Sequence, residues 1–180
     1  MAVLLFPDNT VLINFAHLDR LDLLEQLANG NGRWCATVAR ECAASARQPG
    51  LAGMRDARRI FGPPWFPDAA ELLETRALRD ELARPGDHAH RHLGEAETVA
   101  VMTHRHVDGI FATDDNGAAR LAARHGVRVV RTWGLLQLAA RRDWVDADTV
   151  WGYVQALRAR QRGAPPGVTD RPSFDKWLAS

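Results

Sequence analysis

The sequence has little cysteine, no long apolar run and no leader-like start. Cys35 and Cys42 are its two cysteines, which does not indicate a disulfide framework and favours a reducing environment. No apolar run approaches the roughly 18 residues that a membrane-spanning helix needs. The opening MAVLLFPDNT lacks the basic segment of a signal peptide and is too short to be one. We therefore expect a cytoplasmic protein without membrane association.

Lysine is almost missing as well. Arginine accounts for 22 of the 23 basic residues, and Lys176 is the exception. Arginine is the better bidentate ligand for phosphate, but a genome-wide codon bias predicts the same count, and we favour that simpler explanation. The net charge of +1 argues against a protein that binds nucleic acid mainly through bulk positive charge.

What is present indicates one ordinary globular domain. Hydrophobic residues make up 46% and charged residues 25% of the 180 residues, which is enough chain for a substantial core. We expect a domain over 1–162 and a C-terminal tail over 163–180 with a short helical turn at 174–179.

Strand-like and helix-like segments alternate along the chain. Continuous apolar runs predict strands covered on both faces at 2–6, 33–36, 109–113 and 127–130. Helical spacing predicts helices at 10–28, 38–46, 51–61, 68–83, 93–105, 116–126, 132–142 and 146–161. Because such βα units build parallel sheets with helices on both faces, we expect an α/β protein: a three-layer α/β/α sandwich with a central, mainly parallel sheet. A helical insert is predicted around 48–92.

Acidic residues gather at one end of this predicted sheet. Ligands of open parallel sheets bind beyond the carboxyl ends of the strands. Acids follow the first and third predicted strands, and others lie in the first turns of the helices near them: Asp8, Glu41, Glu95, Glu97, Asp114 and Asp115. The sequence therefore predicts a cluster of carboxylates at this edge.

Several ionised carboxylates cannot share a site without a counter-charge. Mg²⁺ or Mn²⁺ is the usual one, and such an ion lowers the pKa of bound water and clamps a phosphodiester. Each acid alone has a simpler explanation: Asp8 and Asp115 as helix caps, Glu41 as a solvated residue, Glu95 and Glu97 as partners of a helix dipole. Their coincidence at one sheet end favours a metal site.

Four motifs carry a resemblance to a known family. They are FPDNTVLI, TVARE, LGEAETVA and ATDDNGAARLAARHGV, and their order and spacing resemble those of PIN-domain nucleases. The TWGLLQLA stretch also resembles one subgroup of that family, so that the resemblance covers roughly residues 2–160.

The resemblance implies an acidic quartet of Asp8, Glu41, Glu97 and Asp115, with Asp114 and Glu95 as neighbours or alternates. Glu95 and Glu97 are about 200° apart on a helix, so only one can face the site, and we favour Glu97. Asp8, Glu97 and Asp115 would hold the metal ion, with Asp114 and Glu95 as further candidates. Glu41 would complete the shell or orient the attacking water. Thr10 or Asn14 would help to orient Asp8, and Thr113 would match the family's hydroxyl beside the fourth acid.

The implied activity is that of a Mg²⁺- or Mn²⁺-dependent ribonuclease. Many small family members, such as the VapC-like toxins, belong to toxin–antitoxin pairs, so the resemblance admits an antitoxin protein or a second copy of the chain as partners, besides RNA. Candidate RNA-phosphate contacts are Arg55, Arg58, Arg59, Arg120 and Arg124, with a solvated helix face as the equal alternative for each group.

Two other functions remain open. A phosphohydrolase or phosphoacceptor would use Asp8 against phosphate, but that chemistry usually needs an acid two residues on, where Thr10 stands, or a well-placed lysine. The second is a non-catalytic PIN-like module that binds RNA or protein. The presence of all four acids argues against it. We interpret the histidines as a solvated loop rather than a zinc site, and Trp133, Trp144 and Trp151 as core residues.

Overall fold

The computed structural model describes residues 3–180 and contains one three-stranded sheet. The strands are β1 (Leu4–Pro7), β2 (Gly109–Ala112) and β3 (Arg128–Val130), in the order β1-β2-β3, and both pairings are parallel. All three strands therefore end at the same edge of the sheet. Within the described residues, this confirms the predicted parallel α/β architecture.

One predicted strand is not formed. Gly32 makes a single parallel bridge to Leu5, and Cys35 makes another to Trp65. The segment 33–36 thus begins alongside β1 and then turns away, because a helix starts at Ala36. An apolar run alone could not reveal this, since strand formation depends on a continuous backbone partner.

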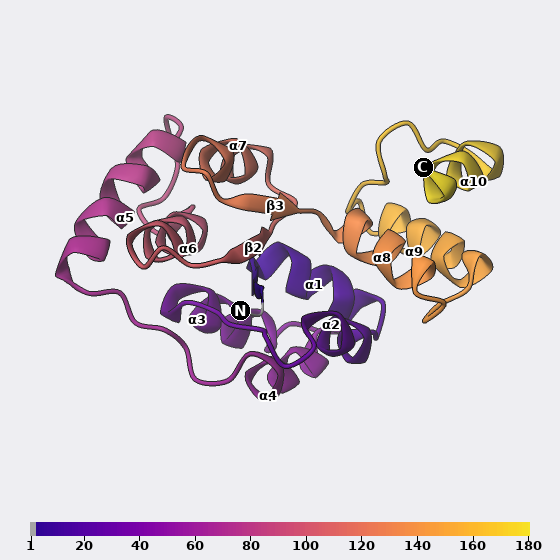
Figure 1. Ribbon diagram of the computed structural model, residues 1–180, viewed down its shortest axis with the longest axis horizontal. Coiled ribbons are helices and arrows are strands. Elements are labelled where there is room, and N and C mark those ends of the chain that lie inside the picture. The colour runs from indigo at the N-terminus through magenta and orange to yellow at the C-terminus, as the bar shows by residue number, and fades with distance from the viewer. Residues whose placement is uncertain (1–2) are drawn as a thin grey trace.

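Helices cover both faces of the sheet (Figure 1). Leu5 points into a core shared with α1 (Asn9–His17), α2 (Leu21–Ala28), α3 (Ala36–Ser45), α4 (Ala57–Phe61), α8 (Thr132–Arg141), α9 (Ala147–Ala159) and α10 (Arg171–Ala179). Phe6 points the other way, into a core shared with α5 (Ala69–Leu82), α6 (Leu93–His104) and α7 (Asn116–Arg124). This alternation of side chains along one strand produces the predicted three layers.

Two helical predictions needed correction. The segment 10–28 forms two helices, because Asp19 adopts a left-handed conformation with φ of 54° and breaks the first one. The tail forms a nine-residue helix, α10, instead of a short turn, because Asp170 and Ser173 form a capping box at its start. The predicted insert contains α4, α5 and a 3₁₀ helix over Ala52–Asp56.

No helix in residues 3–180 combines the length and the apolar character that crossing a bilayer requires.

Candidate active site

Asp8 is fixed at the carboxyl end of β1. Its backbone N–H donates to the carbonyl oxygen of Ala112 over 2.7 Å, which continues the β1–β2 pairing by one residue. Its side chain caps α1 by accepting a hydrogen bond from the Asn9 N–H at 2.7 Å. The hydroxyl of Thr10 donates to its other oxygen. Asp8 is therefore both the expected helix cap and a buried carboxylate aimed at the sheet edge, with 2% of its surface exposed.

Thr113 links Asp8 to Asp115. Its hydroxyl lies 3.3 Å from Oδ2 of Asp8, and it accepts a hydrogen bond from the Asp115 N–H at 3.2 Å. Oδ1 of Asp115 in turn caps α7 by accepting from the Ala118 N–H at 2.7 Å. Among the residues that the structure describes, Oδ2 of Asp115 accepts no hydrogen bond. Thr10 and Thr113 thus occupy the orienting positions that the sequence predicted.

The buried Asp8 and the half-buried Glu41, Glu95 and Asp115 repel one another. Burial, with the negative charge of Glu95, raises the pKa of Asp8 to about 7. Burial, with the charges of Glu95, Asp8 and Glu97, raises the pKa of Glu41 to about 8. Burial and the charge of Asp115 also raise the pKa of Glu95. The charge of Glu95 therefore raises the pKa of Asp8 and of Glu41, and the charge of Asp115 raises the pKa of Glu95.

Glu97 is engaged elsewhere. Its Oε1 accepts from the Thr37 N–H at 2.8 Å, and its Oε2 accepts from the Thr37 hydroxyl at 2.6 Å. Cys35 precedes α3 and provides no side-chain cap, so Glu97 caps this helix from the neighbouring α6. On this geometry we propose Glu95 in place of Glu97 as the third acid, because Glu97 uses both oxygens as a cap, whereas the charge of Glu95 acts on both Asp8 and Glu41.

Asp114 and Asn14 form a separate network. Oδ1 of Asp114 accepts from the Thr132 N–H at 2.9 Å, and Oδ2 accepts from the Thr132 hydroxyl and from the amide of Asn14. Asp114 therefore caps α8. Asn14 orients Asp114, and its side-chain hydrogen bonds within residues 3–180 do not include Asp8, contrary to the expectation.

Glu41 reaches the site across a helix contact. Gly94, in the first turn of α6, is buried against it, and a Cβ atom at this position would lie 2.8 Å from Oε2 of Glu41. No hydrogen bond or ion pair holds this carboxylate in the part of the chain that the structure describes. A half-buried acid without a hydrogen-bond partner is available for a ligand or a proton.

Comparison with known proteins agrees with this geometry. A family model described as a PIN domain matches residues 5–170. The chain belongs to the PIN-domain family. No curated protein matches it. PIN domains have a nuclease-like fold, and they are generally nucleases that use divalent metal ions.

The donor set of this PIN domain fits a hard divalent cation. Its acids offer only oxygen ligands, and Glu41 is a half-buried carboxylate that forms no ion pair within residues 3–180. Nowhere in residues 3–180 are three His, Cys, Asp or Glu side chains already grouped to hold an ion.

His92 was missed by the sequence reasoning. It was interpreted as part of a solvated loop, but its side chain is only 12% exposed, with Nδ1 3.5 Å from Glu95 and Nε2 3.6 Å from Asp87. Its position three residues before Glu95, at the start of α6, was the available signal. His92 therefore borders the acids through Glu95.

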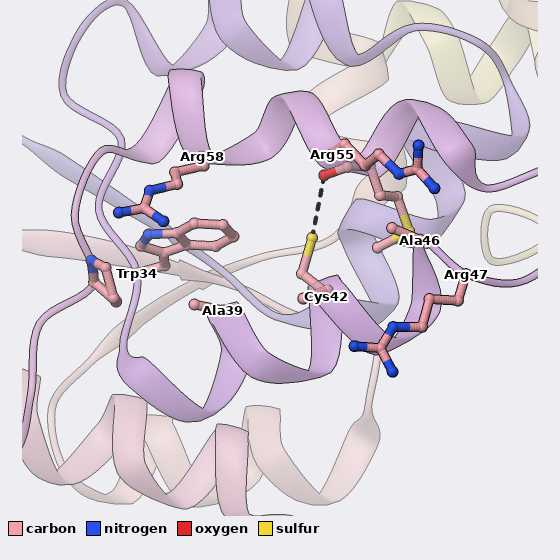
Figure 2. Close-up of a pocket in the computed structure, with 10 residues that line it drawn as sticks. Trp34, Ala39, Cys42, Ala46, Arg47, Arg55 and Arg58 are labelled. Carbon is pink, nitrogen blue, oxygen red and sulfur yellow. Dashed lines mark hydrogen bonds between the residues drawn. The ribbon is translucent and has the colours of Figure 1, made fainter.

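The predicted RNA-binding arginines of the insert lie away from the acids. Arg55 and Arg58 line a pocket of about 370 Å³ beside α3, together with Trp34, Ala39 and Ala46 (Figure 2). Ala39 lies two residues from Glu41 and so on roughly the opposite side of this helix.

Two other candidate arginines pair with acids: Arg59 with Glu25, and Arg124 with Glu81. Arg120 is exposed. Contact of these five arginines with RNA stays a prediction.

Proposed function

We propose that this PIN domain is a Mg²⁺- or Mn²⁺-dependent ribonuclease. The observation that supports it most is the crowding of carboxylates at the carboxyl edge of the sheet: burial first, and the charges of the neighbouring acids second, raise the pKa of Asp8 to about 7 and that of Glu41 to about 8. A protein gains nothing in stability from such crowding. The arrangement is understandable if a divalent cation and a phosphodiester occupy this edge during function.

The proposed acids are Asp8, Glu41, Glu95 and Asp115. Asp8 and Asp115 keep fixed directions, because backbone N–H groups and Thr113 hold them at the strand ends. A divalent cation bound by these acids would lower the pKa of water and offset the charge of the phosphate. Glu41, whose carboxylate has no hydrogen-bond donor in residues 3–180, can accept a proton from the attacking water.

The phosphate-transfer alternative finds less support. Position 10 is occupied by Thr10, whose hydroxyl donates to Asp8 and does not supply a second carboxylate. Lys176 lies on α10, and that helix packs against α9. Both features favour hydrolysis by water over attack by Asp8.

The proposed substrate is RNA. If the protein acts as a toxin, its proposed protein partners are an antitoxin or a second copy of the chain. The test is cleavage of end-labelled single-stranded RNA by the purified chain with Mg²⁺ or with a chelator. Asp8→Asn should abolish cleavage, whereas Asp56→Asn, a matched change at an exposed acid, should not. Cleavage that survives both chelation and Asp8→Asn, or no cleavage of any RNA by the wild type, would refute the proposal.

A further inference from the structure

A cleft of about 670 Å³ opens next to the acids, between the end of β3, α8 and the loop before α10. Asp114 forms part of its wall, so one end adjoins the sheet edge where the proposed acids lie. The residues that matter for its chemistry are Asn116, Arg131, Trp133, Gln137, Arg162 and Trp177. The cleft therefore combines aromatic rings, guanidinium groups and neutral amides.

Two arginines in the cleft are held by neutral groups. Arg131 donates to the carbonyl oxygen of Asp114 at 2.6 Å and to Oδ1 of Asn116 at 2.8 Å. Arg162 donates from Nε to Oδ1 of Asn14 at 2.6 Å and from Nη2 to the carbonyl oxygen of Thr10 at 3.2 Å. Neither arginine forms an ion pair anywhere in residues 3–180. Each guanidinium has five N–H donors, so both keep donors and a full charge for an anion.

Arg162 is tied directly to the proposed active site. Its partners Thr10 and Asn14 lie on α1, the helix that Asp8 caps, and the Thr10 hydroxyl donates to Asp8. A phosphate bound by Arg162 would therefore lie near the phosphate that the acids act on.

The aromatic wall is rigid. The ring of Trp177 packs on Phe174, with 5.7 Å between centroids, and the Trp177 carbonyl accepts a hydrogen bond from Gln137 at 2.7 Å. Trp133 is buried and contributes to the core, as expected from the sequence, while also forming part of the cleft. Trp177 is only partly buried, which leaves ring surface for a flat ligand.

Asp114 is the carboxylate among these lining residues, and both of its oxygens already accept hydrogen bonds. The donors are Thr132, at the start of α8, and Asn14. Two arginines against one such acid leave the cleft with a net positive charge. An anion with a planar apolar face is the ligand that these walls match.

We infer that this cleft binds one nucleotide of single-stranded RNA next to the scissile phosphate, with its base against Trp177 and its phosphate on Arg162 and Arg131. The inference rests on the proposed ribonuclease function and specifies its substrate as unpaired RNA. Aromatic rings and guanidinium groups recognise unstacked bases and phosphates without a base-paired helix. A base inside a duplex cannot turn out against Trp177 without being unpaired first.

The test measures binding without cleavage. A fluorescent oligouridine of about ten nucleotides and an abasic ribose-phosphate oligomer of equal length are titrated by anisotropy into protein that carries Asp8→Asn. Trp177→Ala should weaken oligouridine binding roughly tenfold or more and leave the abasic oligomer unchanged, since only the base stacks. Arg162→Ala should weaken both oligomers and lower the salt-dependence slope by about 0.7, as one phosphate contact is lost.

Controls separate binding from folding. Arg160→Ala removes an exposed arginine two positions from Arg162 and should leave both affinities and the salt slope unchanged. Trp177→Phe keeps an aromatic ring and should retain most of the preference for oligouridine. Equal losses for both oligomers in Trp177→Ala, or an unchanged salt slope in Arg162→Ala, would overturn the inference.

The outcome is distinguishable from failure of the proposed function. Suppose that the wild type cuts RNA with Mg²⁺, but that adding Trp177→Ala or Arg162→Ala to the Asp8→Asn protein does not change its affinity for either oligomer. The proposed nucleotide site is then wrong, and the nuclease proposal stands. If the variants behave as expected but the wild type cuts nothing, the RNA site stands and the ribonuclease proposal fails. A deoxyuridine oligomer that binds as tightly as oligouridine, and that loses the same affinity in Trp177→Ala, would show that the cleft does not distinguish RNA from DNA and would overturn RNA as its specific ligand.

Discussion

Gly94 on α6 lies directly against the carboxylate of Glu41 on α3, so closely that a Cβ atom at Gly94 would be 2.8 Å from Oε2 and 3.3 Å from Cδ of Glu41. The same atom would lie 3.2 Å from Val38. The contact between these two helices therefore sets the position of Glu41, and a single methyl group should displace it.

We predict that Gly94→Ala lowers the RNA cleavage rate at least tenfold, with little change in melting temperature. The methyl group pushes the Glu41 carboxylate from its place, while the gain in helix propensity, about 1 kcal/mol, offsets part of the strain. The measurement is the cleavage rate with Mg²⁺ alongside a thermal melt.

Gly152→Ala is the matched control. Gly152 is in the exposed middle of α9, and a Cβ atom there would meet no other atom within 4 Å. This change should raise stability by about 1 kcal/mol and leave cleavage intact. Full activity in Gly94→Ala would show that the position of Glu41 does not matter for the reaction.

Substitutions of Glu95 and of Glu97 should have different effects on the cleavage rate and on stability. Glu95→Gln removes a charge that acts on Asp8 and Glu41, so the cleavage rate should fall strongly while the fold persists. Glu97→Ala removes the cap of α3 and should cost about 1 kcal/mol of stability. Cleavage rates and thermal melts of both variants decide the matter, and a larger rate loss from Glu97→Ala than from Glu95→Gln would restore the sequence-based preference.

That preference shows where sequence reasoning reached its limit. The two glutamates are two residues apart, and the pattern indicated that only one of them faces the site. Which one it is depends on the rotation of α6 against α3, and this rotation is set by Thr37 and Gly94 from different parts of the chain. No local pattern contains that information.

Features that depend on adjacent residues were predicted well. The runs around β2 and β3 are strands because their apolar residues are continuous, and Asp8 and Asp115 follow strands and cap helices as expected. The segment 33–36 failed because a strand also needs a partner along its length. The place of Arg162 beside the site could not be predicted for a similar reason, because its partner Asn14 is 148 residues away in the sequence.

The stability of the metal-free protein should decrease as the pH rises. The pKa of Asp8, 3.8 in an unstructured chain, is raised to about 7, and that of Glu41, ordinarily 4.5, to about 8. A carboxyl group that holds its proton more tightly in the folded state adds stability below about pH 4, and this contribution is lost as the pH rises through about 7 to 8.

Melting temperatures measured in chelator between about pH 5 and pH 8.5 should therefore decline, and the decline should be smaller in Asp8→Asn and in Glu41→Gln. Parallel curves for all three proteins would show that the two carboxyl groups are not perturbed as described.

A toxin role predicts an effect on cells. Expression of the chain alone in a bacterium should slow growth, because unrestrained cleavage of RNA stops translation, and Asp8→Asn at the same protein level should restore it. Equal growth of the two cultures at matched expression would argue against the toxin role while leaving the nuclease proposal to the cleavage assay.

The most direct test of the metal-dependent site is a melting series with and without Mg²⁺ on the wild type, Asp115→Asn and Asp114→Asn. Within residues 3–180, Oδ2 of Asp115 accepts no hydrogen bond, whereas both oxygens of Asp114 accept hydrogen bonds from Thr132, and Oδ2 also accepts one from Asn14. A cation that binds only the folded protein stabilises it by mass action. We predict that Mg²⁺ raises the melting temperature of the wild type and of Asp114→Asn but hardly that of Asp115→Asn. Equal Mg²⁺ shifts in all three proteins would contradict the metal site.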